Sequence, residues 1–224
     1  MDLAFLISIL IDVLNFATPL LLAATGILIV EKSGVINLGV EGMMIVGALS
    51  GYMIAGALFE CESPGFGGLC LVGGTLSFWA YMGALGGAGL VGAGFAALFG
   101  ILVLILRANQ VATGLGLTIL GLALTNAIGS QGFSLAGVSL EGLVPDSWRN
   151  AGGFQRLASM NIMTFIALAA LPLTLFFLQY TRMGLLLRAV GENHDSAFTL
   201  GYPIRRIRFA AVLFGGFMCA IEYA

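Results

Sequence analysis

Most of this chain consists of long apolar runs that carry almost no charge. A helix needs roughly 20 such residues to cross the hydrocarbon core of a bilayer. Only 9% of the 224 residues are charged, whereas soluble proteins contain about a quarter. The predicted spans are Leu3–Val30, Met43–Phe59, Ala80–Leu106, Val111–Ile128, Ile162–Tyr180 and Phe209–Ala224. We therefore predict an all-α fold, a polytopic transmembrane helical bundle with about six spans present.

One polar segment, Thr181–Arg208, interrupts this pattern and holds five of the nine Lys and Arg residues and the single His. Basic residues next to the ends of membrane spans are retained on the cytoplasmic side. Placing this segment inside and alternating the spans puts seven basic residues inside, against Arg149 and Arg156 outside. The charge distribution therefore predicts a cytoplasmic basic segment and a long external loop at Gly129–Asn161.

A second polar stretch, Glu31–Gly42, separates the first two apolar runs and contains glycines that break helical continuity. Non-helical backbone at membrane depth is tolerated where it is covered by protein or lines a water-filled cavity. Broken helices of this kind are also where transporters bind their solute. Asn37 and Glu41 would then line a translocation path formed by a broken or re-entrant segment. The alternative is an ordinary cytoplasmic turn with both side chains in water.

Small residues recur every four positions in the third apolar run, at Ala88, Gly92, Ala96 and Gly100. Such a stripe lies on one face of a helix and lets two helix backbones approach closely. The partner is either another helix of the same subunit or a second permease subunit.

The residue types that enzymes use for catalysis or metal binding show no recognisable motif in this sequence. Cys61, Cys70 and Cys219 lack metal-site spacing, and the first two are either unpaired or joined by a disulfide. His194 has no second His or Cys nearby, and no phosphate-binding glycine loop or nucleophile with a base is present. We predict no enzyme activity, cofactor, metal or nucleic acid partner, so any ATP hydrolysis would be done by another chain.

Three segments together resemble a known family. They read E-K-S-G-V-I-N-L-G-V-E-G-M-M (Glu31–Met44), L-R-A-N-Q-V-A-T-G-L (Leu106–Leu115) and T-R-M-G-L-L-L-R-A-V-G-E-N (Thr181–Asn193). In order and spacing they are similar to the membrane subunit of ATP-binding-cassette (ABC) importers for nucleosides and simple sugars, a family that includes ribose and branched-chain amino acid permeases. The first segment resembles most the nucleoside importers that work with a surface lipoprotein. The similarity runs from about Phe5 to Gly216.

The resemblance implies that residues 181–208 form a cytoplasmic coupling loop that docks into a groove on a cassette ATPase subunit. The residues that match the family pattern are Gly184, Arg188, Ala189, Gly191, Glu192, Asn193, Ala197 and Gly201. It also implies a second permease subunit, an extracytoplasmic solute-binding lipoprotein, and location as a multi-pass protein in the lipid of a bacterial cytoplasmic (inner) membrane. Solute would pass near Asn37 and Glu41. The alternative for the basic segment is a solvated loop without a partner.

Two positions depart from the family pattern. His194 stands where a proline is usual, and after Gly216 the small residues give way to F-M-C-A-I-E-Y-A with Glu222 in an apolar setting. Family members continue for several further spans, so residues 1–224 are expected to be one transmembrane permease domain, incomplete at its C-terminus. The rival interpretations are a branched-chain amino acid permease, an ion-coupled secondary transporter, and a non-functional remnant.

Overall fold

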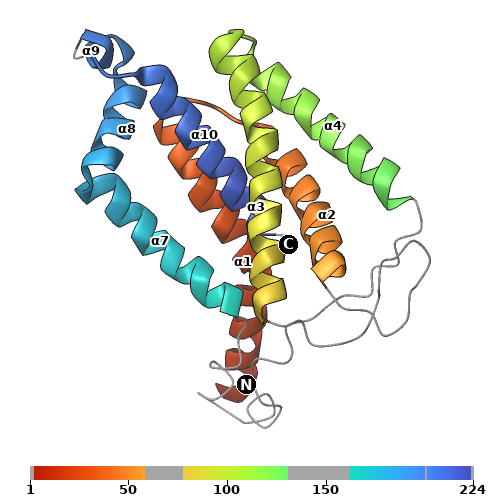
Figure 1. The fold of residues 1–224 in the computed structure, drawn as a ribbon. Helices are drawn as coiled ribbons and strands as arrows, with labels where there is room; N and C mark the ends of the chain where they lie inside the picture. The colour runs from red at the N-terminus through yellow and green to blue at the C-terminus, as the bar shows by residue number, and fades with distance from the viewer. Residues whose placement is uncertain (1–2, 59–77, 131–161, 200, 223–224) are drawn as a thin grey trace.

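The computed structural model describes residues 3–58, 78–130, 162–199 and 201–222, and within these ranges the chain forms helices and no strands. The α-helices are α1 (Leu3–Lys32), α2 (Val40–Leu58), α3 (Phe78–Gly100), α4 (Gln110–Gly129), α7 (Ile162–Tyr180), α8 (Arg182–Glu192), α9 (His194–Thr199) and α10 (Ile204–Ile221). A π-helical turn, Ile101–Ile105, continues α3. The predicted all-α fold is confirmed (Figure 1).

Four helical stretches in the described ranges are long and apolar enough to cross a membrane, namely Ile9–Lys32, Met82–Ile105, Gln110–Gly129 and Met163–Tyr180. The apolar helix Val40–Ala55 within α2 is shorter. The sixth predicted span differs most from its expected bounds. Helix α10 begins at Ile204 rather than Phe209, and its early arginines make it amphipathic instead of uniformly apolar.

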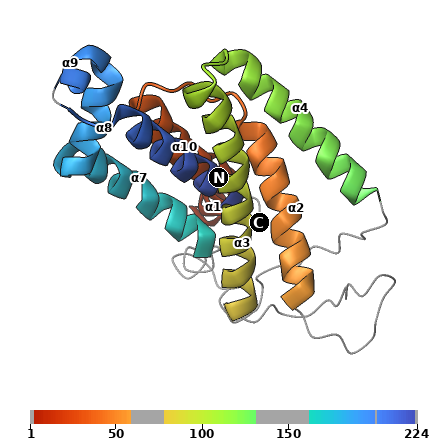
Figure 2. The same ribbon diagram turned by 45° about the horizontal axis from the view of Figure 1, so that its top comes forward.

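The helix ends alternate between two ends of the bundle, as the predicted topology requires. The end of α1, the start of α2, the α3–α4 corner, α8, α9 and the start of α10 lie together at one end (Figure 1). Figure 2 brings this end toward the viewer. These segments carry Lys32, Arg107, Arg182, Arg188, Arg205, Arg206 and Arg208. We call this the basic end of the bundle.

Helix α10 lies at the centre, between α1 and α3, and its closest partner is α3. The predicted small stripe forms this contact: Ala88 and Ala96 are fully buried, and Gly92 faces Gly216 and Ala220 of α10. The ring of Phe209 lies beside Gly100. The structure therefore supports the first alternative for this stripe of small residues, packing against another helix of the same subunit.

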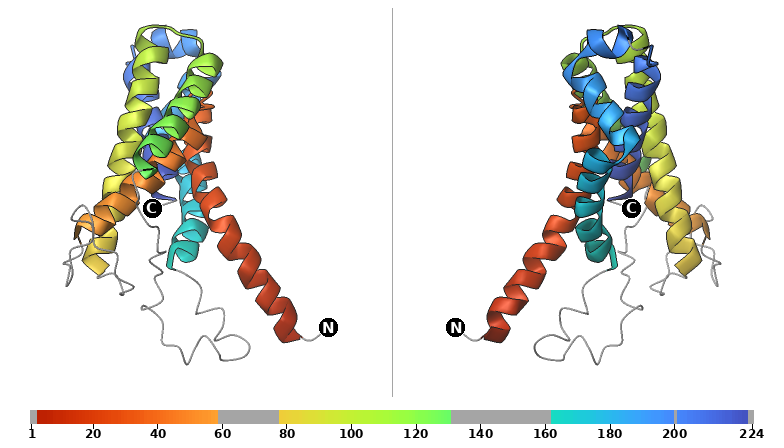
Figure 3. Two further views of the ribbon diagram at one scale, coloured as in Figure 1. Left: turned by 90° about the vertical axis from the view of Figure 1, so that its right-hand side faces the viewer. Right: turned by 90° about the vertical axis from the view of Figure 1, so that its left-hand side faces the viewer.

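The outer helices expose apolar side chains, as expected where lipid is the solvent. The first half of α1 leans away from the bundle (Figure 3), and its Phe16 is 84% exposed. Helix α7 packs on α1 through a polar contact, in which the Thr18 hydroxyl donates to Thr164 at 3.0 Å. Cys219 is a buried free thiol on α10, while Cys61 and Cys70 lie outside the described residues.

Candidate coupling surface and linker

The predicted coupling segment folds into two short helices that turn back from α7. The hydroxyl of Thr181 donates to the carbonyl of Phe177 at 2.6 Å and accepts from the amide of Gly184 at 3.0 Å, so it caps the start of α8. A Cβ at Gly184 would overlap the Phe177 carbonyl and lie 2.7 Å from the Leu178 Cα. Only glycine therefore allows so tight a corner between α7 and α8.

The eight residues predicted to form the coupling loop divide into two groups by exposure. Gly184 and Ala197 are buried, and Gly191 lies with its backbone against the end of α1. Ala189, Glu192, Asn193 and Gly201 are exposed, and Arg188 is half-buried. The first group seats the segment on its own subunit, and the second group lies at the surface of the subunit.

The ion pair at the surface of α8 contributes little to folding, whereas Gly201 has a structural role. Arg188 and Glu192 form an ion pair of 3.7 Å along α8, with side chains 40% and 71% exposed, and such surface pairs are worth about 0–1 kcal/mol. Gly201 has a φ of +79° and nothing within 4 Å of the position where a Cβ would stand. Its left-handed backbone makes the turn into α10, because only glycine adopts that conformation at no steric cost.

Exposed apolar residues stand beside these polar ones, and sequence reasoning did not single them out. Phe198 on α9 is 72% exposed, Leu185 on α8 51% and Tyr202, in the turn after α9, 45%. Their signal in the sequence was an apolar residue inside an otherwise hydrophilic segment. We call Leu185, Ala189, Glu192, Phe198 and Tyr202 the α8–α9 surface. These exposed apolar side chains are a candidate contact site for another protein, because contiguous exposed apolar surface is typical of interaction sites.

Residues 33–39 join α1 to α2 as a non-helical linker at the basic end. The linker turns sharply at Gly34, where φ is +81°. The Ser33 hydroxyl donates to the Val30 carbonyl at 2.6 Å, and Val35 is fully buried in the main core. The predicted break in helical continuity is therefore a short segment anchored to the end of the bundle.

Helix α4 satisfies the backbone groups that the linker leaves unpaired. The side-chain oxygen of Gln110 accepts from the amide of Ile36 at 2.9 Å, and the Thr118 hydroxyl donates to the Leu38 carbonyl at 3.1 Å. Gly39 and Gly114 face each other so closely that a Cβ on Gly114 would lie 2.9 Å from the Gly39 amide nitrogen. Sequence reasoning missed Gln110 and Thr118, because their distance of 74 and 80 residues from their partners gives no local signal.

The two residues predicted to line the translocation path have different environments. Asn37 is buried, its side-chain oxygen accepts from the Gly39 amide at 2.9 Å, and its nitrogen lies 3.6 Å from the Met43 sulfur. Glu41 is exposed in the first turn of α2, where the helix dipole favours an acid. Asn37 thus shapes the start of α2 from inside, and Glu41 is the member of the pair that solvent or solute can reach.

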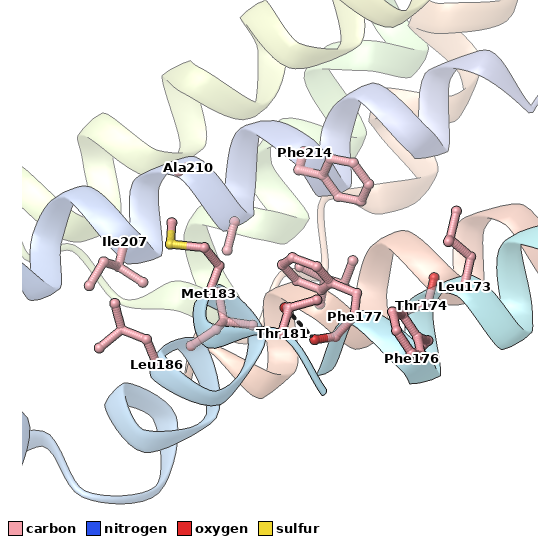
Figure 4. Close-up of a pocket in the computed structure, with 13 residues that line it drawn as sticks. Leu173, Thr174, Phe176, Phe177, Thr181, Met183, Leu186, Ile207, Ala210 and Phe214 are labelled. Carbon is pink, nitrogen blue, oxygen red and sulfur yellow. Dashed lines mark hydrogen bonds between the residues drawn. The ribbon is translucent and has the colours of Figure 1, made fainter. Parts of the chain in front are cut away.

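A groove of about 580 Å³ opens between α7, α8 and α10, with α1 at its floor. Figure 4 shows that its walls are aliphatic and aromatic, with Phe177, Met183, Ile207 and Phe214 facing one another. Its two hydroxyls belong to threonines that already donate to carbonyls of α7. A nucleoside or sugar requires several hydrogen-bond partners, so this groove lacks the chemistry of a solute site.

Within the described ranges, no group of three His, Cys, Asp or Glu residues is placed to hold a metal ion. The side chain of His194 lies outside the part described. The described geometry thus provides exposed apolar and polar side chains on α8, α9 and the following turn at the basic end, and a linker that packs against α4 and α8.

Comparison with known proteins agrees with this picture. Residues 9–222 match the family model for the permease component of the branched-chain amino acid transport system. TsgC13 of Haloferax volcanii, a permease protein provisionally named for a glucose ABC transporter, is 35% identical over 208 residues, which cover 89% of this chain and 56% of TsgC13. No solved structure matches the chain significantly.

Two further relatives are named for nucleoside transport. The nucleoside ABC transporter permease protein NupC of Lactococcus lactis is 30% identical over 216 residues, 92% of this chain and 62% of NupC. The guanosine ABC transporter permease protein NupQ of Bacillus subtilis is 27% identical over 227 aligned positions, 96% of this chain and 66% of NupQ. The chain therefore spans roughly three fifths of the length of these relatives.

The described helices form an apolar bundle whose connections alternate between the basic end and the opposite end. Together with the family match, this defines the class of protein as a multi-pass membrane permease and not an enzyme. Because the family model covers nearly the whole chain, the chain belongs to the family of branched-chain amino acid transport system permease components.

Proposed function

We propose that this chain is the permease subunit of an ABC importer that moves nucleosides or related simple sugars across the cytoplasmic membrane of a prokaryote. A separate cassette ATPase subunit would supply the energy. An extracytoplasmic binding lipoprotein would deliver the solute, and a second permease subunit would complete the path. The basic end would face the cytoplasm, since seven of the nine Lys and Arg residues belong to its segments.

The main observation that supports this proposal is the α8–α9 surface. It projects at the basic end (Figure 1), and it combines the exposed side chains of Phe198, Leu185 and Tyr202 with an exposed ion pair. Protein interfaces typically have such an apolar centre with a polar rim. Beneath it, Gly184 and Gly191 lock α8 onto α7 and α1 by backbone contact. A partner that pushes on this surface would therefore move the bundle.

The proposed class of solute is based on the names of the related proteins. The two named for nucleoside and guanosine transport and the one named for glucose all align with most of this chain. The family description favours branched-chain amino acids as the alternative cargo. Glu41, exposed at the start of α2, and Asn37 behind it remain our proposed path residues. A carboxylate there can accept hydrogen bonds from ribose or sugar hydroxyls, and it can also accept from the ammonium group of an amino acid, so the choice between the two cargo classes rests on the relatives.

Capture of the cassette ATPase by the detergent-solubilised permease tests the coupling role. Phe198→Ala removes the largest exposed apolar side chain of the α8–α9 surface. Burying such a side chain is worth about 1.5–3 kcal/mol, so the dissociation constant should rise roughly ten- to a hundredfold. Val111→Ala is the matched control, because Val111 is also exposed at the basic end but on α4, away from α8 (Figure 1). Equal capture by wild type and Phe198→Ala would contradict the docking assignment.

Uptake by proteoliposomes that contain the complete subunit, its ATPase and its binding protein tests the solute class. Labelled guanosine, ribose and leucine distinguish the two cargo classes directly. Uptake that needs a proton or sodium gradient but no ATP would instead support an ion-coupled secondary transporter. Replacing Glu41 with Gln should lower the uptake of a nucleoside, whereas Glu31→Gln, a second exposed acid at the same end, should leave it unchanged.

A further inference from the structure

Arg208 joins two segments that are far apart in the sequence. From the start of α10, its Nε donates to the carbonyl of Ser33 at 2.9 Å and its Nη2 reaches the carbonyl of Val190 at 3.3 Å. Ser33 opens the linker, and Val190 lies in the last turn of α8. The Arg208 guanidinium therefore connects the end of α8 to the start of the linker.

The backbones on either side of Arg208 also touch directly. A Cβ on Gly191 would overlap the Lys32 carbonyl and lie 3.2 Å from the Gly34 amide nitrogen. A Cβ on Gly34 would lie 3.0 Å from the Arg208 guanidinium. No side chain separates α8 from the linker at this point. Because backbone atoms have no rotamers to change, a displacement of α8 must displace the linker as well.

The linker carries the connection on to α4 and α2. Its Ile36 amide and Leu38 carbonyl are held by Gln110 and Thr118 of α4, and its Asn37 holds the Gly39 amide just before α2. The contacts thus run from α8 through Arg208 to the linker, and from the linker to α4 and α2. The last of them, at Gly39, lies two residues before Glu41.

We propose that Arg208 is a positioning residue for energy coupling, which transmits movement of the α8–α9 surface to the linker and so to the start of α2. This inference rests on the proposed function, because it assumes that a cassette ATPase moves α8. Arg208 itself is half-buried inside the subunit and is distinct from the exposed residues that would meet the ATPase.

The chemistry of the contact requires arginine. A planar guanidinium presents several N–H donors in a fixed fork and stays charged, so it can reach two carbonyls at once. Lysine offers a single ammonium group on a flexible stem and cannot hold both carbonyls in this arrangement. Arg107, at the α3–α4 corner of the basic end, has an exposed side chain and lies outside the 181–208 segment. It provides a control for loss of one positive charge at the same end of the bundle.

The test uses the complete importer with its ATPase and binding protein in proteoliposomes. Arg208→Gln and Arg208→Lys should keep ATPase capture at the wild-type level but lower ATP-driven uptake about tenfold or more, the loss expected when a charged hydrogen bond is broken. Arg107→Gln should transport like wild type. ATP hydrolysis should continue in the Arg208 variants without responding to the loaded binding protein.

Movement of the linker gives a readout besides transport. Ile36 is 54% exposed, so Ile36→Cys, in a background without the three native cysteines, can be labelled by a maleimide with and without ATP. Labelling should change with ATP in the wild type and the Arg107 control, and should not change in Arg208→Gln. Wild-type uptake by Arg208→Gln, or equal losses in the Arg107 control, would overturn the inference. Loss of ATPase capture together with uptake would also overturn it, since Arg208 would then only maintain the fold. Failure of the wild-type subunit to capture the ATPase would instead refute the proposed function itself.

Discussion

The contact between α3 and α10 makes a strong prediction about stability. A Cβ on Gly92 would overlap the Ala220 methyl and lie 2.6 Å from the Gly216 carbonyl oxygen, well inside the 3.4 Å at which ordinary contact begins. The substitution Gly92→Ala must therefore push the two helices apart. Gly94 lies two residues along the same helix, is exposed, and has nothing within 4 Å of its Cβ position. Gly94→Ala is the matched control.

The size of the effect follows from these two environments. Alanine in place of glycine in a helix gains about 0.5–1 kcal/mol from backbone entropy in both variants, so this gain cancels in the comparison. Overpacking in a close contact costs about 1–3 kcal/mol. For a protein of this length each kcal/mol shifts the melting temperature by about 2–4 °C. Gly92→Ala should therefore melt about 2–12 °C below Gly94→Ala.

The single buried thiol of α10 provides the assay. Cys219 is 1% exposed and stands next to Ala220. With Cys61 and Cys70 replaced by serine it is the only one of three cysteines left. Its sulfur lies against the Ala23 carbonyl of α1, so a fluorogenic maleimide reports loss of the packing around α10 during a temperature ramp in detergent. Adding Ala220→Gly should restore part of the loss by removing one of the two clashing groups. Coincident melting of Gly92→Ala and Gly94→Ala would refute the described packing.

Two smaller predictions concern helix ends and helix pairs. The side-chain oxygen of Asn109 accepts from the amides of Val111 and Ala112 at the start of α4, so Asn109→Ala should cost about 1 kcal/mol and lower the melting temperature in the same assay, whereas Asn109→Asp should not. Thr18→Val removes the hydroxyl that joins α1 to Thr164 of α7. Interhelical bonds of this kind in membranes are worth about 0.6 kcal/mol, so a larger loss measured by detergent unfolding would mean that Thr18 also organises other contacts.

The sequence predicted the helices well because lipid imposes a simple rule. A run of apolar residues must become a helix when no water can satisfy its backbone. The predicted Ile162–Tyr180 span and α7 have the same bounds, and Val111–Ile128 differs from α4 by one residue at each end. The start of α10 was placed five residues late. Its charged first residues lie at the basic end of the bundle and lower the local hydropathy, so hydropathy alone does not register them as part of the helix.

The candidate coupling segment could be picked out in the sequence, but its folded arrangement could not be predicted. The charge distribution marked the 181–208 segment, and the family resemblance marked Gly184 and Gly191 within it. Neither indicated that both glycines face inward and make backbone contacts, because exposure depends on the partner helix. Arg208, like Gln110, bonds to a carbonyl or amide distant in the sequence. Such long-range side-chain to backbone bonds leave no pattern in a single sequence.

Under the proposed coupling role, the glycines would explain how movement of the basic segment reaches the rest of the bundle. Gly184 against Phe177, Gly191 against Lys32, and Gly39 against Gly114 are all places where a side chain would not fit. A contact made through long side chains can absorb a displacement by changing rotamers, but a contact between backbones must pass it on. These contacts lie in order from α7 and α8 through the linker to α4. A push on the exposed side of α8 therefore has a rigid route to the start of α2, and the hydrogen bonds of Arg208 keep the middle of that route closed.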